Sequence, residues 1–334
     1  MRRSLAGLVV LLAACRPNGD VPPWHDPTPH QVSFVTVDSG VKLEVVDWGG
    51  KGPTLVFLAG LQDVAHGFDY FAPRFTDRYH VIGITRRGYG ASSQTATGYD
   101  IATRLADDRA VLDSLHLDQV ALVGHSMAGD ELTAFAGAYP ERVTRLVYLD
   151  AVYDHSTLGP IFAAAFPLPP LTAGDSASPL GVQSYLARTW GQHIPESQIR
   201  AIMRFDPTGR LVADVTPISI DSQMLVGAGH PDWGKVRAPS LVISAVVDSV
   251  QQVFPLYATF DDSTKAKARH FTELLMTWGA WGRTHIKAQL KGAEWLDLPG
   301  ANHYVFDSHE AEVEAAMRRF LAGTLSAVDR VDRL

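Results

Sequence analysis

The stretch VALVGHSMAG, residues 120–129, decides the fold, because an apolar run leads there into a tight turn around Ser126. Residues 120–123 (VALV) are typical of a strand buried on both faces, and residues 130–139 indicate a helix. A strand, a tight turn and a helix in this order predict a nucleophile elbow, in which the turn exposes the serine hydroxyl. Small residues are needed two positions before and after the serine, and Gly124 and Ala128 meet that need. Ser126 is therefore the candidate nucleophile.

Other short apolar runs lie on both sides of this stretch. Residues 31–37 and 41–47 are β-rich, and the turn between them predicts a hairpin. Buried parallel strands are predicted at residues 54–58, 81–84, 143–149, 240–245 and 294–298. Helical patterns alternate with these strands, among them residues 101–115 and 309–321. The alternation predicts an α/β fold, with a mostly parallel sheet and helices on both faces.

The alternation stops between residues 152 and 238, where prolines and small residues dominate the first part. We expect this insertion to form a mostly helical cap over the strand ends that carry Ser126. Residues 250–292 are also long and helical, and they carry Trp278 and Trp281. The cap is expected to supply an apolar pocket wall from Phe162, Phe166, Leu168, Leu171, Tyr185, Leu186, Trp190, Ile202 and Met203.

Composition excludes several classes of protein. The chain has 334 residues and a net charge of −7, with 46% hydrophobic and 19% charged residues, so it can bury a core. The acidic balance disfavours a nucleic-acid partner. A single cysteine excludes a disulfide framework within the chain. The histidines have no H-x-H or HExxH spacing and no dinucleotide or phosphate loop is present, so we expect neither a metal nor a cofactor.

The N-terminus predicts export. Residues 1–14 combine two arginines with a short apolar run and indicate a signal peptide. Cys15 follows Leu-Ala-Ala, which resembles the lipobox of bacterial lipoproteins, so we expect an acylated Cys15 and a membrane anchor on the periplasmic or cell-surface side. The alternative is an ordinary signal peptide with an incidental cysteine. Residues 16–30, the tether, contain five prolines and predict a semi-extended spacer without contacts to the core. His25 and His30 in it could bind a metal, but we expect them to be solvated instead.

Several blocks of the remaining chain match one family in order. Residues 57–61 (FLAGL) are similar to its oxyanion loop, residues 85–93 (TRRGYGASS) to its Arg-Gly-x-Gly-x-Ser loop, and GHSMAG to its elbow. An aspartate, Asp248, then follows a strand, and His303 lies near the C-terminus. From residue 31 onward the chain thus resembles the α/β-hydrolase fold superfamily. The resemblance implies an eight-stranded sheet, a core formed by residues 31–151 and 239–334, and a cap at residues 152–238.

The resemblance also implies a catalytic triad. Ser126 would be the nucleophile, His303 its base and Asp248 the carboxylate that holds the histidine. Asp150, at the end of residues 143–149, is the alternative acid, because some members take the acid from that strand. The backbone N–H groups of Leu61 and Met127 would bind the oxyanion.

Four neighbouring residues have simpler interpretations. We expect His125 to pack, His66 to lie at the surface or cap an element rather than line the pocket, and Arg86 and Arg87 to brace loops rather than bind an anionic substrate. 

The pattern as a whole predicts a cofactor-free serine hydrolase that cleaves an ester or similar acyl bond of a small or medium hydrophobic molecule. The alternatives are C–C bond cleavage, lactone opening or peracid formation on the same triad, and a ligand-binding protein that kept the fold. The sequence sets neither the substrate nor the oligomeric state.

Overall fold

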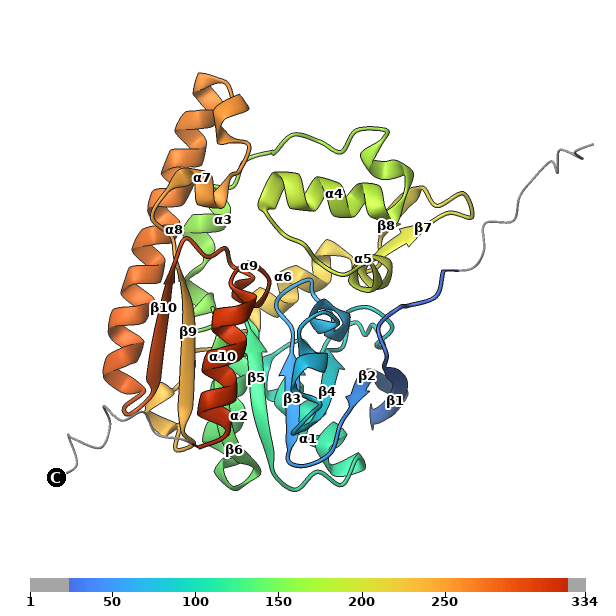
Figure 1. Cartoon of the computed structure of the whole chain (residues 1–334), viewed down its shortest axis with the longest axis vertical. Helices are drawn as coiled ribbons and strands as arrows, with labels where there is room; N and C mark the ends of the chain where they lie inside the picture. The colour runs from blue at the N-terminus through green and yellow to red at the C-terminus, as the bar shows by residue number, and fades with distance from the viewer. Residues whose placement is uncertain (1–23, 324–334) are drawn as a thin grey trace, which may run out of the picture.

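The computed structural model describes residues 24–323 and contains one large sheet (Figure 1). Its strands lie in the order β1-β2-β4-β3-β5-β6-β9-β10. Their bounds are β1 (Gln31–Asp38), β2 (Val41–Gly49), β3 (Thr54–Leu58), β4 (His80–Thr85), β5 (Val120–His125), β6 (Val143–Leu149), β9 (Ser240–Val246) and β10 (Glu294–Pro299). Strand β2 is antiparallel to β1 and β4, and every later pairing is parallel. The predicted mostly parallel α/β sheet is therefore confirmed.

Helices cover both faces of this sheet because the strands are apolar on both. In β3, Leu55 and Phe57 belong to the core under α9 (Val305–Ser308) and α10 (Glu310–Leu321). Val56 and Leu58 belong to the opposite core, under α1 (Ile101–Ser114) and α2 (Ala128–Ala138). Alternation of side chains along a strand gives each face its own core.

The segment between β6 and β9 lies beyond one end of the strands (Figure 1). It contains α3 (Gly159–Ala163), α4 (Pro179–Trp190), α5 (Glu196–Ile202), a hairpin of β7 (Met203–Phe205) and β8 (Leu211–Asp214), and α6 (Ile218–Val226). A second insertion, between β9 and β10, contains α7 (Val250–Val253) and the long helix α8 (Asp262–Gln289). Helix α8 runs beside β10 and extends beyond the strand ends (Figure 1). Two insertions thus reach the same end of the sheet.

The described part of the tether, residues 24–30, contacts the core, so the expectation of no contacts is wrong. The guanidinium of Arg200 in α5 lies over the Trp24 ring, 4.8 Å from its centroid. The His30 side chain is only 8% exposed, and its Nδ1 is 3.6 Å from Oδ1 of Asp69. Prolines prevent a strand here, but these two side chains still dock on the folded domain.

Two further expectations concern the membrane. Cys15 and the predicted signal peptide lie outside the described residues. Between residues 24 and 323, no helix is both long and apolar enough to cross a bilayer.

Candidate functional site

Ser126 lies in a strained turn between β5 and α2. Its φ is 53°, a left-handed conformation that is uncommon outside glycine. The Ser126 N–H donates to the Leu149 carbonyl at 3.2 Å, which ties the turn to the end of β6. A Cβ at Gly129 would lie 1.8 Å from the Ala151 carbonyl oxygen, so only glycine fits there. These contacts hold the half-buried serine at the strand end, as the elbow pattern predicts.

His303 follows β10 and pairs with the carboxylate of Asp150. His303 Nδ1 is 2.6 Å from Asp150 Oδ2. The other oxygen, Oδ1, accepts from the Tyr153 hydroxyl at 2.5 Å and from the Ala245 N–H at 3.0 Å. Asp150 is 3% exposed and has a φ of 45°. Three donors therefore satisfy and orient a buried carboxylate behind the imidazole.

The assignment of Asp248 as the partner of His303 is wrong, and the alternative, Asp150, is right. Asp248 is exposed two residues beyond β9, and its N–H donates to the Gln252 side chain. Strands β6 and β9 are parallel neighbours, so an aspartate that follows either strand lies at the same end of the sheet. The left-handed turn directly after β6 brings Asp150 to His303, whereas Asp248 lies past the point where β9 ends.

The loop after β3 carries Leu61, and Arg86 braces it. Arg86 donates to the carbonyl oxygens of Ala59 at 2.7 Å and Gly60 at 2.9 Å. Its Nε donates to Glu131 of α2 at 2.8 Å. Burial alone would raise the pKa of Glu131, but the charges of Arg86 and Arg104 lower it below its usual range. Arg86 thus joins the loop to the helix that begins after Ser126, and its predicted bracing role is confirmed.

Arg87 and His125 both lie close to these elements and make specific contacts. Arg87 makes a two-pronged ion pair with Asp107, at 2.5 and 2.6 Å, which confirms bracing there too. His125 is buried, and its Nε2 lies 3.0 Å from the carbonyl of His303, so it packs as expected. Burial lowers the pKa of His125, although the nearby Asp63 carboxylate, 3.6 Å away, opposes that shift.

His66 is buried outside the pocket lining, so the predicted surface or capping role is wrong. Its Nδ1 is 3.0 Å from Asp69 Oδ2. Burial would lower the pKa of His66, but its hydrogen bond to Asp69 and the nearby carboxylates of Asp69 and Glu44 raise it to about 10.

A cavity of about 360 Å³ contains Ser126, Asp150 and His303 in its wall. Leu61 and Met127 also line it, so the two predicted oxyanion donors lie beside the serine. Met127 immediately precedes α2, where backbone N–H groups have no intrahelical acceptor. Within residues 24–323, no protein acceptor takes the N–H of Leu61 or Met127.

The rest of the wall is mostly apolar and comes from both insertions. Of the nine side chains expected from the cap, Phe162 and Trp190 line the cavity. Phe166 and Leu168 instead pack around Phe254 of the second insertion. That insertion supplies a large share of the wall: Val247, Gln252, Val253, Phe271, Leu275, Met276, Trp278, Gly279 and Arg283.

Sequence reasoning missed the polar residues of the wall other than the triad, among them Tyr153 and Arg283. Tyr153 holds Asp150 and stacks on Trp278, with ring centroids 4.3 Å apart. Its position three residues after a strand-end aspartate was the available signal. Arg283 of α8 also lines the cavity, and among residues 24–323 no carboxylate lies within ion-pair distance of it. Nothing in the sequence separates this arginine from the other basic residues of α8.

Comparisons with known proteins agree with this architecture. The family model described as alpha/beta hydrolase fold matches residues 53–183, which include Ser126 and Asp150. The chain is 36% identical to the non-heme chloroperoxidase of Streptomyces lividans over 121 residues, 35% of this chain and 44% of that protein. It is 33% identical to the 2-(acetamidomethylene)succinate hydrolase of Mesorhizobium japonicum over 102 residues, 30% of this chain and 36% of that protein.

A solved structure extends the likeness to most of the chain. The crystal structure of E-2-(acetamidomethylene)succinate hydrolase has a TM-score of 0.61 at 20% identity, covering 86% of this chain and 98% of that one. Sheet order, elbow and these likenesses together establish that the chain has the α/β-hydrolase fold. The matched segments span less than half the length of the two curated relatives.

Proposed function

We propose that the protein is a cofactor-free serine hydrolase that cleaves an ester or related acyl bond through Ser126, His303 and Asp150. One observation carries the proposal. His303 is held by a buried carboxylate at 2.6 Å, in the wall of the same cavity as a serine on a strained elbow. A serine, a histidine and a carboxylate so arranged can activate a hydroxyl for attack on a carbonyl.

Each residue has a defined task in the proposed reaction. Asp150 keeps the proton on Nδ1 of His303, so Nε2 is free to take the Ser126 proton as Oγ attacks the carbonyl carbon. The N–H groups of Leu61 and Met127 stabilise the oxyanion. His303 then gives the proton to the leaving alkoxide, and water releases the acyl group from Ser126 by the same steps.

The cavity wall favours an amphipathic acyl substrate. Its apolar side chains suit a short or medium hydrocarbon chain. Arg283 adds one cation, which makes no ion pair with a carboxylate among residues 24–323. We therefore expect the preferred acyl group to combine an apolar stretch with a single anionic group that reaches Arg283.

The location of the activity is part of the same proposal. The Leu-Ala-Ala-Cys sequence and the tether support export and a lipid anchor at Cys15. Palmitate labelling of the full chain should disappear in Cys15→Ser. Labelling that persists in this variant would contradict the anchor.

Turnover of a chromogenic ester series by the full-length protein tests the proposed activity. Acyl chains of increasing length should give a preferred length, and Ser126→Ala should abolish turnover. Ser222→Ala, an exposed serine of α6, is the matched control and should turn over normally. A lactone and a β-diketone in the same panel separate ester cleavage from lactone and C–C bond cleavage. Unchanged turnover in Ser126→Ala would refute the proposal.

A further inference from the structure

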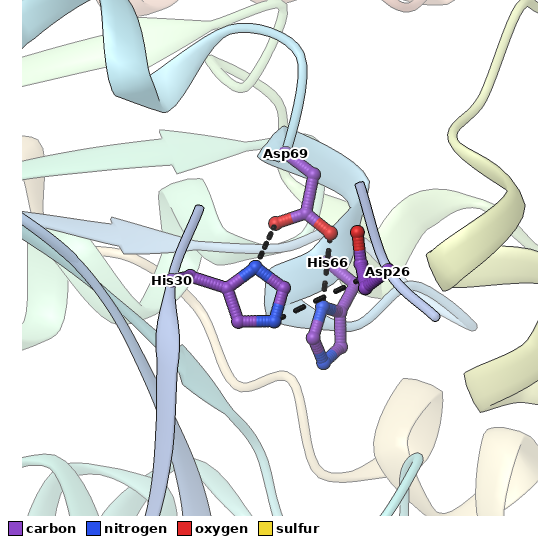
Figure 2. Close-up of side chains that lie close together, drawn as sticks. All are labelled: Asp26, His30, His66 and Asp69. Carbon is purple, nitrogen blue, oxygen red and sulfur yellow. Dashed lines mark hydrogen bonds and ion pairs between the residues drawn. The ribbon is translucent and has the colours of Figure 1, made fainter. Parts of the chain in front are cut away.

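Two histidines and two aspartates meet where the tether docks on the core (Figure 2). Asp26 and His30 come from the tether, and His66 and Asp69 come from the 3₁₀ turn Ala65–Phe68 and the residue that follows it. Each side chain offers one ligand atom, and the four atoms all lie within 4.8 Å of one another. The cluster lies outside the cavity that contains Ser126.

We propose that this cluster binds one divalent zinc ion, which fastens the tether to the folded domain. Two imidazole nitrogens and two carboxylate oxygens are a ligand set that suits zinc and allows tetrahedral coordination. The hard ions Mg²⁺ and Ca²⁺ prefer sites made of oxygen ligands alone. The histidines therefore select the class of metal.

An unpartnered ring nitrogen supports a ligand at this place. His30 Nδ1 is buried and makes no hydrogen bond, although it lies 3.6 Å from Asp69 Oδ1. Its other nitrogen is 3.9 Å from Asp26 Oδ2. A buried polar nitrogen normally has a partner, because leaving it unpaired costs free energy. A metal bound between His30 Nδ1 and Asp69 would supply that partner.

The charges around the cluster also favour a cation. Asp26, Asp69 and the buried Glu44 place three carboxylates around two imidazoles. A divalent ion bound among these groups would balance this negative charge.

Neighbouring groups already orient the two core ligands. Asp69 accepts from the Trp48 indole at 2.7 Å and from the Ser197 hydroxyl of α5 at 2.5 Å. A carboxylate has about four acceptor sites, so these bonds leave capacity for a metal. The Nε2 of His66 faces Glu44 Oε1 at 3.7 Å, as in sites where a carboxylate holds the far side of a ligating histidine.

Binding would draw the tether closer to the domain. Zinc–ligand distances of about 2.0–2.2 Å place tetrahedral ligand atoms about 3.4 Å apart, so ligand atoms that now lie within 4.8 Å of one another have to move closer. The tether can supply that movement, because Asp26 and His30 approach from outside the sheet core. Sequence spacing missed the cluster because its two pairs, each on its own segment, become neighbours only after folding.

Zinc binding to the full-length protein tests the proposal, and His25 provides a matched control. His25 is an exposed histidine of the same tether outside the cluster. Metal content is measured by mass spectrometry after dialysis against ZnCl₂, and affinity by competition with a chelating dye. The wild type and His25→Ala should each retain one zinc per chain, and Mg²⁺ should not compete. His30→Ala should weaken zinc binding by about 100-fold or more.

A second variant guards against a folding artefact. Asp26→Asn removes one charge with little change in shape, and it should also weaken zinc binding by at least about tenfold while the circular dichroism spectrum stays that of the wild type. No zinc retained by the wild type would overturn the proposal. So would equal affinity in His30→Ala, or an equal loss in His25→Ala.

Discussion

The imidazole of His303 lies 2.6 Å from the carboxylate of Asp150, although the two residues are 153 positions apart in the chain. The opposite oxygen of that carboxylate is held by Tyr153 and by the backbone of β9. Strands β6, β9 and β10 are adjacent, so three consecutive strand ends supply the acid, its backbone donor and the histidine. This arrangement fixes the ring orientation on which the proposed chemistry depends.

Asp150 and Asp248, the two candidate acids, can be compared directly by mutation. Asp150→Asn should lower kcat by about 10⁴-fold, because an amide favours the wrong tautomer of His303. Asp248→Asn should leave kcat within about twofold, since that side chain is exposed and does not line the cavity. Steady-state measurement of kcat for both variants on one ester identifies the acid of the triad. A large loss in Asp248→Asn with little change in Asp150→Asn would contradict the assignment.

Arg86 is expected to act as a positioning residue for the oxyanion loop. Arg86→Lys keeps the charge but loses the fork that spans Ala59, Gly60 and Glu131, so kcat should fall by about 10- to 100-fold with little change in KM. Arg87→Lys is the control, because Arg87 braces Asp107 instead. Equal losses of kcat in both variants would indicate a general effect on folding, and the role given to Arg86 would be wrong.

Arg283 is expected to select substrates with an anionic group. Arg283→Met should lower kcat/KM for a half-ester of a dicarboxylic acid by about 10- to 100-fold, the worth of a charge-assisted hydrogen bond. Turnover of a neutral ester of the same length should change little. Arg269 lies on the exposed side of the same helix, so Arg269→Met should leave kcat/KM unchanged for both esters. A parallel loss on both esters in Arg283→Met would show that Arg283 supports the fold rather than the substrate.

The elbow glycine tests the packing behind Ser126. Gly129→Ala should destabilise the protein by about 3 kcal/mol, because the new methyl would lie 1.8 Å from the Ala151 carbonyl oxygen. Gly159→Ala, also in a helix, meets no atom within 4 Å and should be neutral or stabilising. Thermal unfolding followed by circular dichroism gives both values. Equal Tm values for the two variants would mean that the backbone behind the elbow can move aside.

Local pattern predicted much of this structure. Strand positions followed from short apolar runs, and each predicted strand lies within two residues of an observed one. The Ser126 elbow also followed from local sequence, because its small neighbours are a steric requirement of the turn. The identity of the triad acid did not follow from local sequence, since Asp150 and Asp248 follow neighbouring strands and lie at the same end of the sheet. Only the left-handed turn at Asp150 and its two further donors distinguish them.

Contacts between distant segments were the part that local pattern could not supply. The apolar composition of the cap predicted that Phe166 and Leu168 line the pocket, but they pack around Phe254 instead. In the same way, His30 and His66 look unrelated in sequence, yet their ring centroids lie 5.0 Å apart. Whether a side chain is buried follows from the composition and hydrophobic periodicity of its segment, whereas the residue that it contacts depends on the topology of the fold.

Peptide mapping of a covalent adduct shows whether Ser126 is the nucleophile that His303 and Asp150 activate. The full-length protein is treated with a fluorophosphonate, and the modified peptide is identified by mass spectrometry. We predict one adduct on Ser126, lost in His303→Ala, strongly slowed in Asp150→Asn and retained in Asp248→Asn. An adduct on another residue, or labelling of Ser126 that is as fast in His303→Ala as in the wild type, would contradict the proposed triad.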